Sequence, residues 1–329
     1  MNYYASEIDK YAIQITQKNF PDTIQLGDIR KVQAGELPKI DLLVAGSPCQ
    51  DLSFAGKRKG LIHGERSNLF FEFLRLYQEL RPKYFIVENV KMKKEYQDII
   101  SDKLGVQPVE INSNIFSAQN RKRLYWTNIP LDSLPPDKGI LLKDILLDDA
   151  QEPMLSNIYG GFKEKKPRVH YNKSVTIRTA SGGGHIPSVC LKEMLHSQDA
   201  IAYMERGNKK WAQAGSRRAD GYTQTPDKDK AFALTANFYK GVPYNYFKDT
   251  RYDSPNIRKL HPIECERLQT VPDNYTEGVS NTQRFKMIGN GMTVDVIAFL
   301  LKNAKGIDNV LSCFDGMSCT QLAIERNKK

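Results

Sequence analysis

The chain has 329 residues, 40% of them hydrophobic, which is enough for a full hydrophobic core and two domains. The mean hydropathy is −0.52, and no apolar run comes near the ~18 residues that a membrane span needs. The N-terminus lacks a signal-peptide pattern. These features exclude a membrane protein and predict a cytoplasmic one. The formal net charge of +10 favours a polyanionic partner, because neutralised phosphates release counterions. A merely soluble basic protein is the alternative.

Cysteine and histidine usage gives no sign of a metal site. The five cysteines are odd in number and scattered, without a C-x-x-C pair, and the five histidines are scattered as well. This distribution favours a reducing compartment and argues against structural zinc or another bound metal.

The first half of the chain alternates strands and helices. Four apolar runs are predicted as strands, at 3–7, 23–26, 40–45 and 84–87. Helices are predicted between them at 8–19 and at 68–80, the second stopped by Arg81-Pro82. This alternation predicts an α/β fold with a doubly wound, mostly parallel sheet.

One cysteine stands at a position typical of chemistry. Cys49 lies in a polar, proline-restricted turn directly after the strand at 40–45, and open α/β sheets place their active sites beyond such strand ends. A small buried hydrophobe is the alternative, since free cysteine is among the most buried residue types. The polar neighbours of Cys49 favour a functional thiol.

The amino-acid composition changes after the strand predicted at 124–127. Residues 148–255 are rich in Gly, Lys, Asn, Ser and Tyr, so we expect a second, irregular β-rich domain between the two parts of the first, 1–147 and 256–329. Lysine-led strands at 173–180 and 230–236 lead into loops that can approach phosphates and bases. Solvated surface loops are the alternative.

The last part of the chain returns to regular elements. In order, they are a helix at 260–270, a glycine turn at 287–292, a helix at 294–303, a strand at 310–314, a turn at 315–318 and a helix at 321–326. A strand, a glycine turn and a helix in succession bind nucleotides in many folds, because the turn lets a ligand approach the helix N-terminus. A single glycine is a weak signal by itself.

Several short motifs together resemble the motif set of the cytosine-C5 DNA methyltransferases. They are Pro48-Cys49-Gln50, Arg66-Ser67-Asn68-Leu69-Phe70, Glu88-Asn89-Val90, Gln119-Asn120-Arg121-Lys122-Arg123, Arg267-Leu268-Gln269, Gly289-Asn290 and Phe314-Asp315-Gly316. Glu7 and Asp28 match the acids that close the second and third strands of that family. The resemblance implies a Rossmann-like methyltransferase fold, a target-recognition domain at 148–255, and methyl transfer to carbon 5 of a flipped-out cytosine in a specific DNA sequence.

The resemblance also implies the catalytic residues. Cys49 would add to carbon 6 of cytosine and so split one difficult step into easier ones. Arg121 or Arg123 would supply the positive surroundings that ionise the thiol. Glu88 would offset the charge that develops at the ring nitrogen, the alternative being an acid simply paired with an arginine.

S-adenosylmethionine is the implied cofactor. Phe314 would pack on the adenine, Glu7 would accept from the ribose hydroxyls, and Asp28 would take the adenine amino group. The remaining cofactor-binding residues that the resemblance implies are Ile8, Ile29, Pro48, Leu69, Asn290, Asp315 and Gly316. An ordinary helix-capping acid is the alternative for Glu7.

Double-stranded DNA is the implied partner. We expect the protein to be a monomer that belongs to a restriction–modification system in a bacterial or phage-infected cell. Extruding the target base costs a few kcal/mol, which contacts in the pocket offset. The residues expected to contact DNA are Ser53, Lys57, Arg58, Lys59 and Gln119. Glycines beside Lys57–Lys59 would let that loop close over DNA and exclude water, although a solvated charged loop is the alternative.

Two features depart from the family. Ser318 and Cys319 stand where many members have glycines, in the loop that the resemblance implies for cofactor binding. The cofactor loop also comes last instead of first, as if the chain were circularly permuted, with the cut in a surface loop between the first helix and the second strand. The same chemistry on RNA, such as tRNA, and a catalytically idle DNA-binding relative are the alternative functions.

Overall fold

The computed structural model describes residues 1–46, 69–147, 150–156, 168–177, 188–191 and 257–328. The chain divides into two compact units: unit 1 comprises Met1–Ile145, Asn172–Ile186 and His261–Lys329, and unit 2 comprises Leu146–Tyr171 and Pro187–Leu260. The division after Ile145 lies close to the boundary predicted after 147. The segment from Asn172, however, belongs to unit 1, whereas the sequence placed it in the second domain.

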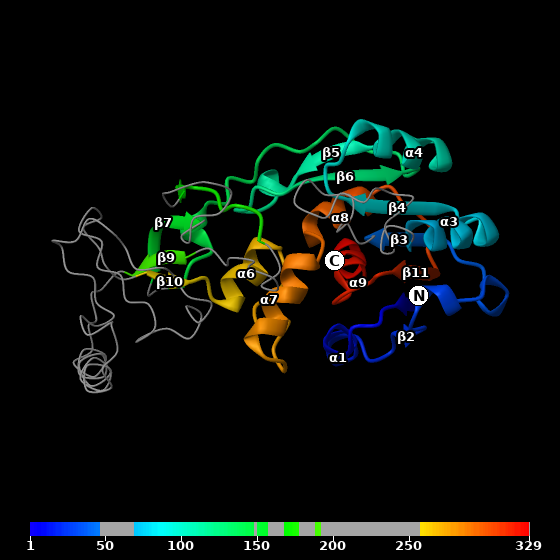
Figure 1. The fold of residues 1–329 in the computed structure, drawn as a ribbon, viewed down its shortest axis with the longest axis horizontal. Coiled ribbons are helices and arrows are strands. Elements are labelled where there is room, and N and C mark those ends of the chain that lie inside the picture. The colour runs from blue at the N-terminus through cyan, green and yellow to red at the C-terminus, as the bar shows by residue number, and fades with distance from the viewer. Residues whose placement is uncertain (47–68, 148–149, 157–167, 178–187, 192–256, 329) are drawn as a thin grey trace, which may run out of the picture. The chain divides into compact units, whose positions relative to one another are not determined.

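In the described part of unit 1, seven strands form one sheet in the order β2-β1-β11-β3-β4-β6-β5 (Figure 1). Their bounds are β1 Asn2–Ser6, β2 Ile24–Gln25, β3 Leu42–Gly46, β4 Tyr84–Asn89, β5 Val109–Asn112, β6 Lys122–Thr127 and β11 Asn309–Cys313. The strands from β2 to β4 pair in parallel, and β6 runs antiparallel to both β4 and β5. The predicted mostly parallel α/β sheet is confirmed, with a strand from the end of the sequence near its middle.

The described part of the chain also contains α-helices. Their bounds are α1 Lys10–Asn19, α3 Leu69–Leu80, α4 Lys94–Leu104, α6 Pro262–Leu268, α7 Asn281–Asn290, α8 Val294–Leu301 and α9 Cys319–Lys328. α1 begins two residues later than predicted, because the Asp9 carboxylate accepts from Tyr11 N at 3.0 Å and caps it. α3 has the predicted spacing, which buries Phe70, Phe73 and Leu74 on one side.

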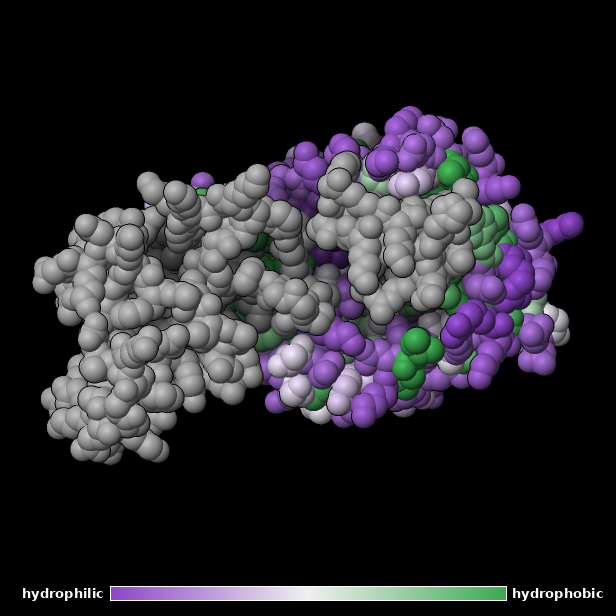
Figure 2. All heavy atoms as spheres, in the orientation of Figure 1, coloured by the Kyte–Doolittle hydropathy of each residue, from purple (hydrophilic) through white to green (hydrophobic). Residues whose placement is uncertain are grey.

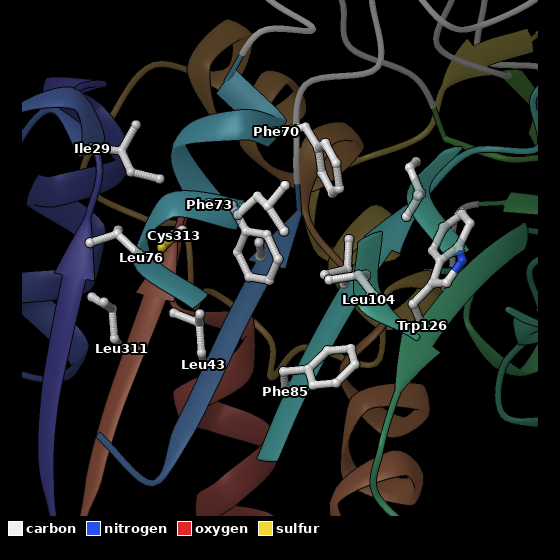
Figure 3. Packing of buried hydrophobic residues seen from close by; sticks show 14 of the residues in the cluster. Ile29, Leu43, Phe70, Phe73, Leu76, Phe85, Leu104, Trp126, Leu311 and Cys313 are labelled. Carbon is white, nitrogen blue, oxygen red and sulfur yellow. The ribbon is translucent and has the colours of Figure 1, made fainter. Parts of the chain in front are cut away.

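The main core lies between the sheet and the helices α3 and α4. Figure 3 shows Phe73 of α3 beside Leu43 of β3 and Phe85 of β4, all buried. Trp126 of β6 is buried in the same cluster, and its indole Nε1 donates to Ser101 Oγ of α4 at 2.9 Å. Because strand side chains alternate, the neighbours of these core residues point to the opposite face of the sheet.

Unit 2 is a small antiparallel sheet in its described part. The strands are ordered β10-β9-β7-β8, with β7 Ala150–Ser156, β8 Arg168–His170, β9 Ser188–Leu191 and β10 Ile257–Lys259. This agrees with the β-rich second domain that the composition predicts. The lysine-led strand predicted at 230–236 lies outside the described residues.

The predicted glycine turn at 287–292 is wrong. Residues up to Asn290 continue α7, because Phe285, Met287 and Ile288 bury its apolar side. Gly291 follows at an ordinary φ of −64°. Its lack of a side chain serves packing, since a Cβ there would lie 3.0 Å from Met317 Cε.

The described surface in the view of Figure 2 is mostly hydrophilic, with hydrophobic residues in small separate groups. Within the described ranges, no helix combines the length and apolar character that crossing a membrane requires. Nor do three His, Cys, Asp or Glu side chains of these ranges gather as metal ligands would.

Candidate active site

Several of the predicted site residues lie at the carboxyl edge of the sheet, where neighbouring parallel strands end together. Ser6 of β1 pairs with Cys313 of β11, and Cys313 pairs with Ala45 of β3. One residue further on, Gly46 of β3 pairs with Glu88 of β4. Glu7, Phe314, Gly46 and Glu88 therefore follow one another along this edge.

Glu88 lies buried on the face of the sheet opposite α3. Its direct cross-strand partner is Tyr125 of β6, and the period of two puts Arg123 on the same face. Arg123 Nε lies 3.0 Å from Glu88 Oε1, with the N–H aimed elsewhere, so the contact is ionic rather than a hydrogen bond. Burial and the charge of Glu88 raise the pKa of Tyr125, which keeps that phenol neutral.

The lack of a side chain at Gly46 makes room for the end of Met292, beside Glu88. A Cβ at Gly46 would lie 2.8 Å from Met292 Cε and 3.8 Å from Glu88 Oε2. Residues 47–68 lie outside the described residues, and with them Pro48, Cys49, Ser53 and Lys57–Lys59.

Arg121 acts on the backbone instead of on an acid. Its buried guanidinium donates to the carbonyl oxygens of Gly291 at 2.9 Å, Gly289 at 3.3 Å and Ile177 at 3.4 Å. Burial, with the neighbouring Arg123 charge, lowers its pKa to about 10, which leaves it protonated at neutral pH. Within the described residues, Arg121 Nε and Glu88 Oε1 are buried without a hydrogen-bond partner, as the walls of a polar ligand site can be.

The predicted DNA contact of Gln119 does not agree with the structure. Gln119 has 0% exposed surface, its Nε2 donates to Leu268 O at 3.1 Å, and its Oε1 accepts from Ile177 N at 3.3 Å. Both ends of the amide are thus used inside unit 1. Gln119 positions the chain and does not reach DNA in this conformation.

A segment that the sequence assigned to the second domain holds this arrangement together. We call residues 172–177 the strap. Lys173 Nζ of the strap donates to Ile140 O at 2.6 Å, Asn114 O at 2.9 Å and Ser117 O at 3.3 Å, and Ser174 N donates to Ala118 O at 2.6 Å. Nothing in the local sequence marks these partners, which lie more than 30 residues away. The loops that the sequence expects to approach phosphates, at 181–184 and 237–241, lie outside the described residues.

The cofactor loop, Phe314–Ser318, has an unusual backbone. Phe314, Gly316 and Ser318 have φ values of +58°, +62° and +61°. Glu7 joins this loop to the end of β1, because its Oε2 accepts from Gly316 N at 2.8 Å and its Oε1 from Ile8 N at 2.7 Å. Glu7 therefore lies against the Phe314–Ser318 loop.

Asp315 points into the protein. It is 8% exposed, and its carboxylate accepts from Tyr3 Oη at 2.7 Å and from Ser318 Oγ at 2.6 Å. Burial raises its pKa to about 6, against the lowering effect of the hydrogen bonds from Ser318, Ser312 and Tyr3.

The residues around this loop fit a nucleoside-bearing cofactor. A Cβ at Gly316 would meet nothing within 4 Å, so space lies open there. The Glu7 carboxylate borders the loop, and the N–H groups of Ile8, Asp9 and Gly316 leave about one of its four lone pairs for a hydroxyl donor. Ile8 next to it is 73% exposed, which provides an apolar surface beside these acceptors.

The other predicted cofactor residues differ in accessibility. Asp28 caps Arg30 N and pairs with the Arg30 guanidinium at 3.0 Å, which holds its pKa at about 2 and keeps it an acceptor. Leu69 is half-buried at the start of α3, and Asn290 is exposed at the end of α7. Ile29 is buried in the core, so only a small part of it can touch a ligand.

Comparisons with known proteins point to one family. The profile described as C-5 cytosine-specific DNA methylase matches residues 1–306. The type II methyltransferase M.NgoBV of Neisseria gonorrhoeae is 35% identical over 304 residues, covering 82% of this chain and 69% of the relative. The type II methyltransferase M1.ScrFI of Lactococcus lactis subsp. cremoris is 30% identical over 306 residues, covering 89% and 69%. The crystal structure of a Spodoptera frugiperda DNMT2 mutant is similar in fold, with a TM-score of 0.54 and 17% identity over 91% of each chain.

Proposed function

The chain belongs to the family of C-5 cytosine-specific DNA methylases, and from this premise we propose which of its residues carry the reaction. It is a DNA (cytosine-5-)-methyltransferase that uses S-adenosylmethionine. The cofactor supplies an electrophilic methyl group when bound. One observation supports the assignment of residues: Phe314, Gly46 and Glu88 adjoin one another through the paired ends of β11, β3 and β4.

Cys49 is the nucleophile in this proposal. Its thiolate forms a bond to carbon 6 of cytosine, which makes carbon 5 electron-rich enough to accept the methyl group. The proton on carbon 5 then leaves, the bond between sulfur and carbon 6 breaks, and the thiolate is regenerated. The loop that carries Cys49 begins at Gly46, beside the Glu88 carboxylate.

Glu88 acts on the ring from the other side. Its carboxyl group shares a proton with the ring nitrogen and so offsets the charge that develops when sulfur adds. Arg123 holds Glu88 in place through the 3.0 Å ionic contact. Arg121 positions the backbone at Gly289 and Gly291, at the end of α7.

For the cofactor, we propose that Phe314 packs on the adenine and that Glu7 accepts from the ribose hydroxyls. The open space at Gly316 and the exposed side chain of Ile8 support this placement. Asp28, Leu69 and Asn290 complete the pocket, and Pro48 borders it from the Cys49 loop.

Unit 2 is proposed as the target-recognition domain, and Ser53 and Lys57–Lys59 as contacts to the DNA from which the cytosine is flipped. The relatives are named type II methyltransferases, so we place the protein in a bacterial or phage restriction–modification system, as a cytoplasmic monomer without a metal. These assignments rest on the charge of +10 and on the relatives.

The order of the elements is proposed to be a circular permutation. The family profile matches up to residue 306, and the next strand, β11, lies between β1 and β3 and carries the Phe314–Ser318 loop. We propose that β11 and α9 are the first strand and first helix of the family fold, placed after the other motifs. A variant with residues 307–329 moved in front of Met1 should then methylate DNA, and an inactive but folded variant would contradict the proposal.

Methyl transfer from labelled S-adenosylmethionine to duplex DNA and to tRNA tests the function. We expect label in DNA, located at carbon 5 of cytosine by bisulfite sequencing, and no transfer by Cys49→Ala. Transfer to tRNA alone would support the RNA alternative, and DNA binding without any transfer would support the idle relative.

A further inference from the structure

Asp315 and Ser318 stand in the cofactor loop, yet their polar groups are occupied inside the protein. Asp315 accepts from Tyr3 Oη and Ser318 Oγ, and Ser318 Oγ also lies 3.1 Å from Thr16 Oγ1. All four side chains are buried. Hydrogen-bonded groups in this arrangement are not available to a ligand unless the network opens.

The same loop is fixed at its backbone from three further directions. Phe314 N donates to Ser6 O at 2.9 Å, and Gly316 N donates to Glu7 Oε2 at 2.8 Å. Tyr275 Oη donates to Met317 O at 2.8 Å. The loop is thus held by β1, by the segment after α6 and by its own side chains.

This support has a physical reason. A residue with a side chain is disfavoured at positive φ, and two such residues, Phe314 and Ser318, adopt it here within five positions. Glycine adopts this conformation freely, whereas serine needs compensating contacts. The hydroxyl of Ser318 supplies them through Asp315 and Thr16.

We propose that Asp315 and Ser318 are positioning residues: with Tyr3 they hold the left-handed turn at 314–318 in the shape that binds S-adenosylmethionine, without touching it. The network stabilises a backbone conformation that glycine would adopt freely. In this proposal Asp315 does not bind the cofactor directly, contrary to the prediction from the sequence. The inference rests on the proposed cofactor site at Phe314, Gly316 and Glu7.

Two substitutions at one position separate positioning from direct contact. Ser318→Ala removes the hydroxyl but keeps a Cβ at a φ of +61°, so we expect affinity for S-adenosylhomocysteine to fall about tenfold. Ser318→Gly removes the hydroxyl as well, but glycine takes the same φ freely, so we expect affinity within about threefold of the wild type. At saturating cofactor, the turnover number of Ser318→Ala and of Ser318→Gly should equal that of the wild type, because residue 318 does not contact the cytosine.

Calorimetric titration of the folded protein with S-adenosylhomocysteine is the readout, with unfolding temperatures measured alongside. Ser101→Ala in α4 is the matched control, because it also removes a buried serine hydroxyl that makes hydrogen bonds, and its affinity should equal that of the wild type. If Ser318→Ala does not fold, Tyr3→Phe tests the same network and should also weaken binding.

Equal losses in Ser318→Ala and Ser318→Gly would overturn the proposal, because they would mean that the hydroxyl binds the cofactor itself. Unchanged affinity in both Ser318→Ala and Tyr3→Phe would overturn it too. A wild-type protein that does not bind S-adenosylhomocysteine would instead contradict the proposed cofactor site.

Discussion

The buried carboxyl group of Asp315 should make folding stability depend on pH in a defined direction. Its pKa is raised from 3.8 to about 6 in the folded state by burial. Between these values the folded protein binds more protons than the unfolded chain, so the free energy of unfolding falls as pH rises. The stabilisation from the protonated carboxyl is fully present below about pH 4 and is lost once the pH exceeds about 6.

The size of this effect follows from the shift. A shift of roughly 2 units corresponds to about 3 kcal/mol of free energy of unfolding. Asp315→Asn fills the same space and does not titrate, so its free energy of unfolding relative to the wild type should rise by about 2 kcal/mol between pH 4.5 and 7.5, because the unfolded carboxyl is already largely ionised at pH 4.5. The hydrogen bonds altered by the amide shift this difference by a constant amount and leave its slope with pH unchanged.

Urea unfolding of both proteins at several pH values measures the difference directly. A difference that stays flat across this range would refute the reasoning, because it would show that Asp315 titrates like an exposed acid. At pH 7.5 the same variant should bind S-adenosylhomocysteine more weakly than the wild type does. Its stability relative to the wild type should be at least as high at pH 7.5 as at pH 4.5. A purely structural role would instead lower affinity and stability together.

Three further outcomes are expected from the geometry. Glu88→Gln should lower the turnover number by about 10²–10⁴-fold with little change in cofactor affinity, because it removes the acid beside Gly46 without changing the size of the side chain. Single-turnover methylation measures this, and a wild-type turnover number would contradict it. Phe73→Ala should destabilise the protein by about 3–5 kcal/mol, since it empties a fully buried site between α3 and the sheet. Urea unfolding measures this, and a decrease in the free energy of unfolding of less than about 1 kcal/mol would be inconsistent with the described core. Lys173→Met should cost about 2–3 kcal/mol in the same assay, because carbonyl groups lose a charged donor, whereas Lys173→Arg should cost less.

Part of the fold could be predicted because its signals are local. The strands at the carboxyl edge are short apolar runs that end in polar residues, and α3 carries a regular stripe of Phe70, Phe73 and Leu74. Parallel pairing then brings Glu7, Phe314 and Glu88 to one edge, which follows from the strand order that the family resemblance implies.

Other parts depend on contacts between distant residues. α4 and β5 were not predicted, since α4 has an apolar side interrupted by lysines and acids, and β5 has only four residues. Gln119 and Lys173 look like surface residues in the sequence, and only the folded chain shows the carbonyl groups that they hold. The predicted glycine turn at 287–292 was wrong because Gly289 is used for burial within α7 rather than for a bend.

Trapping with a fluorinated substrate tests the central claim most directly. Duplex DNA that carries 5-fluorocytosine at the methylated position, incubated with the protein and S-adenosylmethionine, should give a stable covalent complex, because fluorine on carbon 5 cannot leave as a proton does. Peptide mapping should locate the bond at Cys49, and Cys49→Ala should bind the same DNA without forming it. A bond to another residue, or no bond from protein that methylates the unfluorinated duplex, would contradict the proposed reaction.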